Sequence, residues 1–281
     1  MRQLNKWRLI SPELTSRLLY FNVFGRFPDI DNPKDLNEKI LAQAFRGDTS
    51  GWSELADKYA VRAYVEEKGL GDILVPMYGV WDTVEDIDFD SLPDSFVLKT
   101  TDGTARNIIV KDKSSLNPEA VRKQLRRWMD EKRINDEPHY QGIKRRIIAE
   151  HLLATDDGLA PTDYKIYCIG GRAEYCLACV NRDMRTFRGN FALFKLPEWR
   201  NINGIAENWK TDKMVRRPVH LEAMIDYAVR LAGDFPLVRV DFYEEEGKVF
   251  FGEMTFTSFA GRAEVFTQSM LCEIGDKVQL R

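Results

Sequence analysis

The chain has 281 residues, of which 44% are hydrophobic and 30% are charged, and its formal net charge at pH 7 is −3. This length and composition describe a folded protein with ample core, and they exclude an intrinsically disordered chain. The slightly acidic balance excludes a generally basic surface of the kind that binds nucleic acids, so we expect no nucleic-acid partner.

The cellular compartment is predicted from apolar runs and cysteines. No apolar run approaches the roughly 20 residues of a membrane span, so no transmembrane segment is expected. Among four cysteines, Cys176 and Cys179 have CxxC spacing, but the segment 174–180 is typical of a strand, and no second CxxC or nearby histidine completes a zinc site. Buried reduced thiols, together with the missing signal-peptide pattern, predict a cytoplasmic protein.

Residues 1–75 are predicted to form a short, mainly helical N-terminal region. A helix is expected to start at Ser11 and Pro12, and its crowded apolar residues should pack on the protein itself, although contact with a membrane or a partner is an alternative. Further helices are predicted within residues 34–70, with Ser53 as a cap and Gly69 as a stop.

Residues 76–155 are predicted to form a lid subdomain. Strands are expected at 96–100 and 107–111, joined by a loop of small residues, and a helix should begin at Asn117 and Pro118. An apolar strand, IIAEHLL, follows at residues 147–153. Its edge is expected to be exposed and to offer backbone groups to a flat base.

Residues 156–281 are predicted to form a C-terminal subdomain. Its elements are a hairpin around Gly170 and Gly171, a helix within residues 218–236, and a second hairpin at 238–256. Antiparallel pairs interleaved with single helices predict an α+β fold with mostly antiparallel sheets. The motifs GxGxxG and GxxxxGK[ST] are absent from the sequence, which leaves Rossmann and P-loop folds without support.

The C-terminal hairpin, VRVDFYEEEGKVFFGEMTF, raises the question of why a strand face carries charge. If residues 245–247 form a three-residue loop, Asp241 opposes Phe251 and Arg239 opposes Glu253. The two carboxylates of Asp241 and Glu253 then lie on diagonal positions, roughly 7–8 Å apart, within reach of one Mg²⁺ ion. The alternative is a solvated face with an Arg–Glu pair.

The same register predicts the two faces of this hairpin. The core face should carry Val238, Val240, Phe242, Phe250 and Met254. The other face should carry Arg239, Asp241, Phe251, Glu253 and Thr255.

Five side chains are candidates for a nucleotide site. Lys99 ends a strand before a glycine-containing turn, where a lysine and backbone N–H groups can bind phosphate, although most strand-end lysines are simply solvated. Glu150 stands alone in its apolar strand, which is also a common solubility device. Asp163 and Lys165 share a strand face and could bind ribose and phosphate. Arg239 is suited to stabilise developing negative charge.

The order of these parts resembles the ATP-grasp superfamily, and more narrowly its TupA-like branch, which is found in bacterial capsule and exopolysaccharide gene clusters. The resemblance covers most of the chain. The motifs that carry it are NEKI (37–40), DKYAVRAYVEEKGLGDILVP (57–76), LPDSFVLK (92–99), DYKIYCIGG (163–171), NRD (181–183) and RVDFY with FGEMTF (239–256).

The resemblance implies an ATP-grasp fold, in which two α+β subdomains clasp ATP, and it assigns roles to residues. The implied ATP-binding residues are Lys58, Lys99, Gly103, Thr104, Arg106, Glu150, Leu153, Asp163 and Lys165. The implied metal ligands are Asp241, Glu253 and Thr255. The implied catalytic residues are Arg239, Lys99 and Arg262. Where many relatives have Asn, this chain has Thr255, so one Mg²⁺ is expected more than two.

The implied function is an ATP- and Mg²⁺-dependent carboxylate–amine ligase that forms an amide through an acyl phosphate. Its partners would be a small-molecule or sugar-linked carboxylate and an amine, with a hexuronic acid or amino acid as the acid. The resemblance also implies peripheral association with polysaccharide assembly machinery. Arg182, Arg185 and Arg188 are candidates to bind this acid, or they form a solvated loop. The alternatives are a glycosyltransferase of the same pathway and a non-catalytic nucleotide-binding module.

Overall fold

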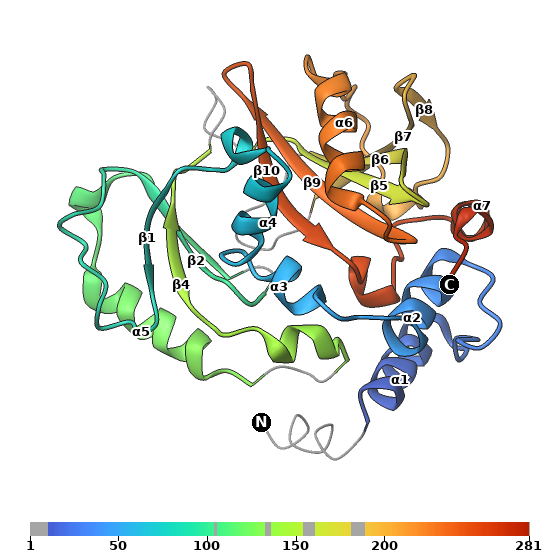
Figure 1. The fold of residues 1–281 in the computed structure, drawn as a ribbon, viewed down its shortest axis with the longest axis horizontal. Helices are drawn as coiled ribbons and strands as arrows, with labels where there is room; N and C mark the ends of the chain where they lie inside the picture. Colours follow the sequence, from blue (N-terminus) through green and yellow to red (C-terminus); the bar gives the residue numbers. More distant parts are fainter. Residues whose placement is uncertain (1–10, 104–105, 133–135, 154–160, 181–188, 281) are drawn as a thin grey trace.

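The computed structural model describes residues 11–103, 106–132, 136–153, 161–180 and 189–280. It has an α+β fold built on two antiparallel sheets, as predicted. In Figure 1 the four-stranded sheet and its helix lie on one side of the molecule, and the six-stranded sheet, in yellow to red, lies on the other. Among the described residues, no helix is long and apolar enough to cross a membrane.

In the part of the chain that the structure describes, four α-helices precede the first strand. They are α1 (Pro12–Phe24), α2 (Leu36–Arg46), α3 (Trp52–Ala56) and α4 (Val61–Glu67). Ser11 caps α1 as predicted, because its hydroxyl accepts a hydrogen bond from the N–H of Leu14. The prediction that Ser53 is a cap was wrong: Gly51 occupies that position, and the hydroxyl of Ser53 instead donates to the carbonyl of His139.

The four-stranded sheet has the strand order β1-β4-β2-β3. Its strands are β1 (Met77–Trp81), β2 (Phe96–Thr100), β3 (Asn107–Val110) and β4 (Ile147–Glu150), and α5 (Pro118–Asp130) packs on it. For residues 147–150 the expected exposed edge was wrong, because β4 lies between β1 and β2 and all four of its residues are buried. The backbone groups of β4 are therefore hydrogen-bonded to β1 and β2.

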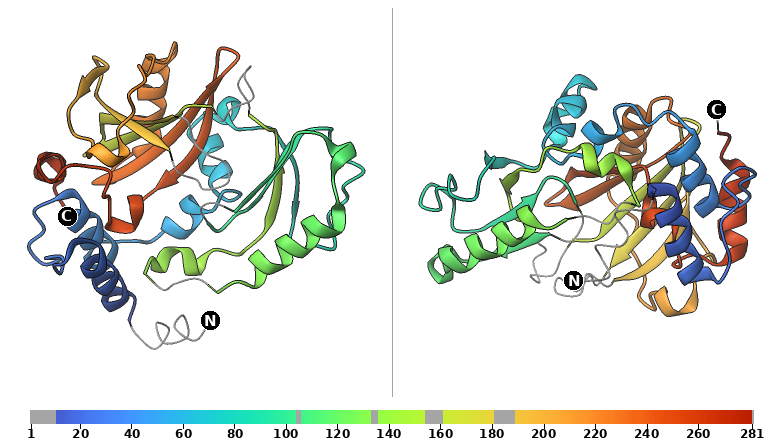
Figure 2. Two further views of the ribbon diagram at one scale, coloured as in Figure 1. Left: turned by 180° about the vertical axis from the view of Figure 1, so that it is seen from behind. Right: turned by 90° about the horizontal axis from the view of Figure 1, so that it is seen from below.

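The six-stranded sheet has the strand order β10-β9-β5-β6-β7-β8. Its strands are β5 (Asp163–Ile169), β6 (Arg172–Val180), β7 (Asn190–Lys195), β8 (Arg200–Ile202), β9 (Leu237–Glu245) and β10 (Lys248–Thr255). One face packs against α6 (Leu221–Ala232), α3 and α4, and the other packs against α2 and α7 (Gln268–Lys277). Figure 2 shows the two sheets from behind and from below.

The two faces of this sheet settle the CxxC question. Cys176 belongs to the core cluster on the α6 face, and Cys179 belongs to the cluster on the α7 face. Both thiols are free and buried, and they point to opposite sides of β6. One metal ion therefore cannot reach both thiols.

Short 3-10 turns complete the fold. They are η2 (Gly71–Ile73), η3 (Lys113–Ser115), η4 (Pro138–Gly142), η5 (Glu207–Trp209) and η6 (Ser258–Gly261). Two residues separate the turn η6 from the end of β10, and η6 has positive φ angles at Phe259, Ala260 and Gly261. Gly261 is needed there, because a Cβ atom would lie 2.6 Å from Cδ2 of Leu41 on α2. Helix α2 therefore supports the backbone at the end of β10.

Candidate functional site

The β9–β10 hairpin aligns its charged residues differently from the predicted register. The turn consists of Glu246 and Gly247 alone, both with positive φ, so the three-residue loop was wrong. A bulge at Gly252 then shifts the pairing, and Glu253 lies directly opposite Asp241. A side chain at position 252 would lie 3.0 Å from the ring of Tyr243, which explains the glycine.

The bulge also changes which phenylalanine reaches the core. Phe251, predicted on the charged face, is 5% exposed and packs in the core cluster with Val240 and Met254. Phe250, predicted in the core, is half-buried instead. The remaining faces agree with the prediction, because the bulge restores the alternation at Glu253.

Arg239 organises the charged face of this hairpin. Its Nε and Nη2 donate to the two carboxylate oxygens of Asp241, at 2.6 and 2.7 Å. Its Nη2 also donates to Oε1 of Glu253 at 3.0 Å and to Oγ1 of Thr255 at 3.1 Å. Its Nη1 reaches Oγ of Ser258 in η6 at 3.4 Å. Burial alone would lower the pKa of Arg239, but the Asp241 carboxylate raises it well above its usual range.

Lys165 and Asp163, the pair predicted on β5, join the same network. The Nζ of Lys165 donates to Oδ2 of Asp163 and to Oδ2 of Asp241, at 2.6 Å in each case. Asp163 and Asp241 are each 1% exposed, and Lys165 is 6% exposed. Burial raises the pKa of Asp241, against the lowering effect of Arg239 and Lys165. The structure thus brings the predicted ribose and metal residues into one buried cluster.

The oxygen atoms of this cluster are of the kind that Mg²⁺ prefers as ligands. Asp241 and Glu253 are direct cross-strand partners, with the hydroxyl of Thr255 bonded to Oε1 of Glu253 at 3.2 Å. The described residues contain no group of three or more His, Cys, Asp and Glu side chains that could hold a metal. Two carboxylates suit Mg²⁺, which leaves its other positions to water and phosphate oxygens, whereas a zinc site would need more protein ligands.

On the four-stranded sheet, Lys99 and Glu150 lie side by side. The Nζ of Lys99 donates to Oε2 of Glu150 at 2.8 Å, and Arg62 of α4 approaches Oε1 of the same carboxylate at 3.5 Å. Glu150 is 7% exposed, so a buried carboxylate orients two cations here. A pair of cations fixed this way is suited to bind phosphate oxygens.

Lys58 connects the two sheets. Its Nζ donates to the carbonyl of Gly103 at 2.7 Å and lies 3.6 Å from Oε2 of Glu253. Its backbone N–H donates to the carbonyl of Thr101, so the chain around it is tied to the loop that follows β2. The neighbouring Asp57 accepts the N–H groups of Tyr59 and Ala60, which fixes the start of α4. Lys58 therefore sits between the predicted phosphate loop and the predicted metal pair.

The other predicted ATP-binding residues are less central. Arg106 directly precedes β3, and its guanidinium lies 3.2 Å from the Glu131 carboxylate and 3.6 Å from the Asp102 carboxylate. Leu153 is half-buried after the end of β4. Thr104 lies outside the described residues, as do the acid-binding candidates Arg182, Arg185 and Arg188.

Arg262 lies at the end of η6. Its Nη2 pairs with Asp136 at 2.9 Å, and the hydroxyl of Thr257 bonds to the carboxylate of Glu137. Asp136 and Glu137 precede η4, which lies in the chain between α5 and β4. These bonds join the segment after the β9–β10 hairpin to the segment before β4. Because η6 also contacts Arg239 through Ser258, Arg262 and Arg239 flank the same turn.

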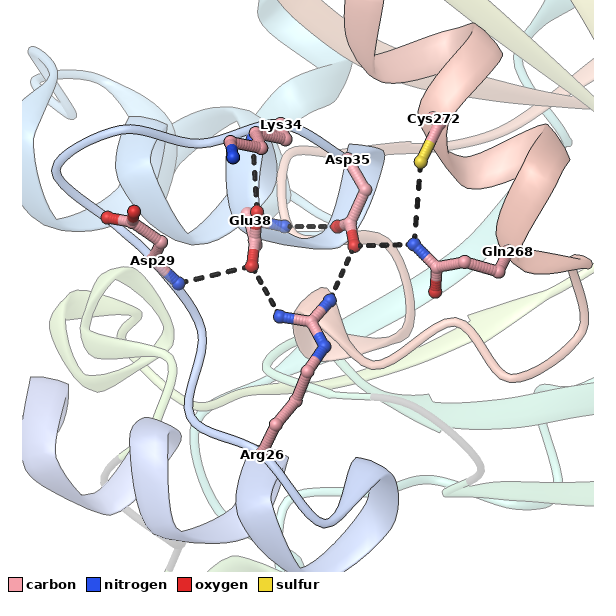
Figure 3. A pocket seen from close by; sticks show the side chains of 7 residues that line it. All are labelled: Arg26, Asp29, Lys34, Asp35, Glu38, Gln268 and Cys272. Carbon is pink, nitrogen blue, oxygen red and sulfur yellow. Dashed lines mark hydrogen bonds and ion pairs between the residues drawn. The ribbon is translucent and has the colours of Figure 1, made fainter.

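A second charged cluster lies at the start of α2 and lines a cavity of 390 Å³ (Figure 3). Arg26 pairs there with Asp35 and Glu38, at 2.8 and 2.5 Å. The carboxylates also accept backbone N–H groups: Asp35 accepts that of Glu38, and Glu38 accepts those of Asp29 and Lys34. This cluster fixes α2, whose Asn37 accepts the N–H of Ala263 at 2.9 Å and so holds the chain after η6.

Several residues of the site were missed in the sequence. Arg62 lies within the DKYAVRAYVEEKG motif and has helical spacing from Lys58, which is a signal that could have found it. Asp136 and Ser258 gave no signal, because each lies in an irregular segment far along the chain from its partner. Contacts of this kind depend on the tertiary fold.

Comparisons with known proteins agree with this architecture. An L-amino acid ligase from Bacillus licheniformis superposes with a TM-score of 0.51 at 11% identity, over 86% of this chain and 52% of that one. A D-alanine–D-alanine ligase from Bacillus anthracis complexed with ATP matches with a TM-score of 0.41 at 13% identity, over 72% and 54% of the two chains. The chain thus spans between half and two thirds of the length of the first solved structures it matches. No curated protein sequence matches it.

The family model is more specific than the structural likenesses. The model described as TupA-like ATPgrasp matches residues 38–279, which is most of the chain. The antiparallel sheets also differ from the parallel sheet of a Rossmann fold, in agreement with the missing GxGxxG motif. The chain belongs to the TupA-like ATP-grasp family.

Proposed function

We propose that this protein is an ATP- and Mg²⁺-dependent carboxylate–amine ligase that forms an amide through an acyl phosphate. The observation that carries the proposal is the direct pairing of Asp241 with Glu253 beside Arg239, joined to the loop after β2 by Lys58. Such a reaction depends on positioning the reactants and neutralising the charge of the phosphates. Cations on both sheets are suited to this task. A nucleophilic Ser–His or Cys–His pair is not required.

In this proposal each part of the site has a task. Lys58, Lys99 and Arg62 bind the phosphates of ATP, and Glu150 orients Lys99 and Arg62. Asp241 and Glu253 hold Mg²⁺, with Thr255 beside them, and when bound the ion neutralises charge on the transferred phosphoryl group. Arg239 stabilises the negative charge that develops when the amine attacks the acyl phosphate.

The acid substrate is proposed to bind near η6. Arg262 already pairs with the carboxylate of Asp136, and a substrate carboxylate has the same chemistry. Arg239, which contacts the same turn, would then face the activated carbonyl. A hexuronic acid or an amino acid, in a pathway of capsular or exopolysaccharide synthesis, is the proposed class, and cytoplasmic ATP is the proposed energy source.

The experiment traps the acyl phosphate. Purified protein is given ATP, Mg²⁺ and hydroxylamine with a panel of hexuronic and amino acids, and both hydroxamate and ADP are measured. We expect acid-dependent hydroxamate from the wild type, and none from the variant carrying Asp241→Asn and Glu253→Gln.

The control variant is Asp82→Asn, which removes an exposed ion pair with Lys144 on the lid lobe and should keep full activity. Retained turnover in the double variant would show that the hairpin carboxylates are structural. ATP binding with no hydroxamate from any acid would favour the non-catalytic nucleotide-binding module instead.

A further inference from the structure

Lys165 has an environment that differs from that of a phosphate-binding lysine. It lies on β5 directly opposite Asp241 of β9, which lies directly opposite Glu253 of β10. The three residues therefore form one row across three neighbouring strands. Lys58 lies at the end of this row, near Glu253. The Lys58 side chain is 17% exposed, whereas the Lys165 side chain is 8% exposed. A lysine that contacts a soluble nucleotide needs the more open position.

The hydrogen bonds of Asp241 give Lys165 a specific effect. A carboxylate has about four lone-pair sites on its two oxygens. Oδ2 of Asp241 accepts from Lys165 and from Nη2 of Arg239, which occupies both of its sites. Oδ1 accepts from Nε of Arg239. One lone pair on Oδ1 is left for a metal ion, so the two cations select the oxygen that Asp241 can present.

Asp163 fixes Lys165 in turn. It lies two residues earlier on the same face of β5, and its Oδ2 accepts from Nζ of Lys165 at 2.6 Å. Two buried carboxylates therefore hold one ammonium group between them, and the ammonium cannot leave without exposing both charges to a low dielectric. This arrangement is typical of a group that orients a metal ligand.

We propose that Lys165 is a positioning residue that holds Asp241 for the divalent cation and does not contact the phosphates of ATP. The inference rests on the metal assignment of the proposed function. It replaces the phosphate-binding role that the sequence predicted for Lys165. Asp163 acts with Lys165 as its anchor.

The experiment measures metal and nucleotide binding separately. Mn²⁺ binding to the full-length protein, in the presence of the nonhydrolysable analogue AMP-PNP, is followed by electron paramagnetic resonance. AMP-PNP binding in EDTA is followed by calorimetry. For Lys165→Met we expect the Mn²⁺ dissociation constant to rise by about 10- to 100-fold, as for other changes behind a metal ligand. The affinity for AMP-PNP in EDTA should stay that of the wild type.

A matched control is Lys195→Met, which removes a lysine that pairs with Glu174 in the same sheet and should change neither binding constant. If Lys165→Met does not fold, the double variant Asp163→Asn with Lys165→Met removes the cation together with its anchor and is tested in its place. We expect the same loss of Mn²⁺ affinity from it.

Each contrary result has its own meaning. Wild-type Mn²⁺ affinity in the variants would overturn the positioning role and leave the proposed function intact. A loss of AMP-PNP affinity in EDTA would make Lys165 a direct phosphate ligand, which also overturns the inference. A wild type that binds AMP-PNP but no Mn²⁺ would contradict the metal assignment itself.

Discussion

Two buried charge clusters of this protein use the same residue types in different ways. In the α2 cluster, the carboxylates of Asp35 and Glu38 accept backbone N–H groups as well as the guanidinium of Arg26 (Figure 3). In the hairpin cluster, all the bonds to the Asp241 carboxylate come from the side chains of Arg239 and Lys165. The carboxylates of the α2 cluster are tied to the backbone, whereas the Asp241 carboxylate is tied to side chains.

This difference separates a structural cluster from a site. Backbone donors in the α2 cluster are fixed by the helix start, and a carboxylate that leaves them would expose buried N–H groups. In the hairpin cluster, the side chain of Lys58 is not fixed in this way and can change partners when a cation or an anion enters. The hairpin cluster alternates in sign from Asp163 through Lys165, Asp241, Arg239 and Glu253 to Lys58, so three carboxylates already have three counter-charges.

Arg239→Met is expected to lower the free energy of unfolding more than the other variants. It leaves Asp241 buried with one partner fewer, and breaking a buried ion pair costs about 3–5 kcal/mol of the free energy of unfolding. Arg26→Met should cost clearly less, because the Arg26 side chain is 44% exposed and backbone donors remain for both carboxylates. Urea denaturation of the two variants measures both losses.

The conservative variant Arg239→Lys distinguishes charge from geometry. It keeps the positive charge but cannot donate to both oxygens of Asp241, so it should recover part of the stability. Equal losses for Arg239→Met and Arg26→Met would contradict the distinction between the two clusters.

A smaller effect is expected from Gly252→Ala, which tests the bulge that aligns the hairpin cluster. The new Cβ atom would lie 3.0 Å from Tyr243 and 3.1 Å from the carbonyl oxygen of Asp241. Overpacking of this kind costs about 1–3 kcal/mol. Gly71→Ala is the control, because its Cβ atom would meet Cγ of Glu66 at an ordinary 3.5 Å. A Gly252→Ala protein as stable as the wild type would mean that the bulge is not sterically required.

The β9–β10 hairpin also shows which structural features could be predicted from the sequence. Alternation of apolar and polar residues correctly predicted both strands and the face of Asp241, because burial enforces a period of two. The predicted pairing of β9 with β10 was wrong. The two-residue turn and the bulge at Gly252 leave the residue composition of both strands unchanged, so the sequence pattern did not reveal them. A single extra residue in β10 was enough to move Phe251 from the charged face to the core.

The position of Glu150 could not be predicted for a different reason. Its strand was recognised, but an isolated apolar segment is compatible with the edge or the centre of a sheet. Only the pairing of β4 with both β1 and β2, from segments more than 40 residues earlier, places it in the centre. Likewise the contact of Lys165 with Asp241 depends on the pairing of β5 with β9.

The smallest expected effect is a difference in pH dependence between the clusters. Burial raises the pKa of Glu38, but bonds from the Lys34 N–H, Arg26 and the Asp29 N–H lower it overall below 4.5. Its contribution to stability is therefore complete above pH 4.5 and is lost as the pH falls through the folded-state pKa. Wild type should lose its advantage over Glu38→Gln in that range.

Asp241 should behave with the opposite sign, because burial raises its pKa above 3.8. The folded protein then binds this proton more tightly than the unfolded chain, so stability falls as the pH rises from 3.8 through the folded-state pKa. As the pH rises, the free energy of unfolding of wild type should therefore fall relative to that of Asp241→Asn. Over the same range it should rise relative to that of Glu38→Gln. Urea titrations of the three proteins across this range give the two differences. Parallel differences would mean that the side-chain cations compensate Asp241 as fully as the backbone compensates Glu38.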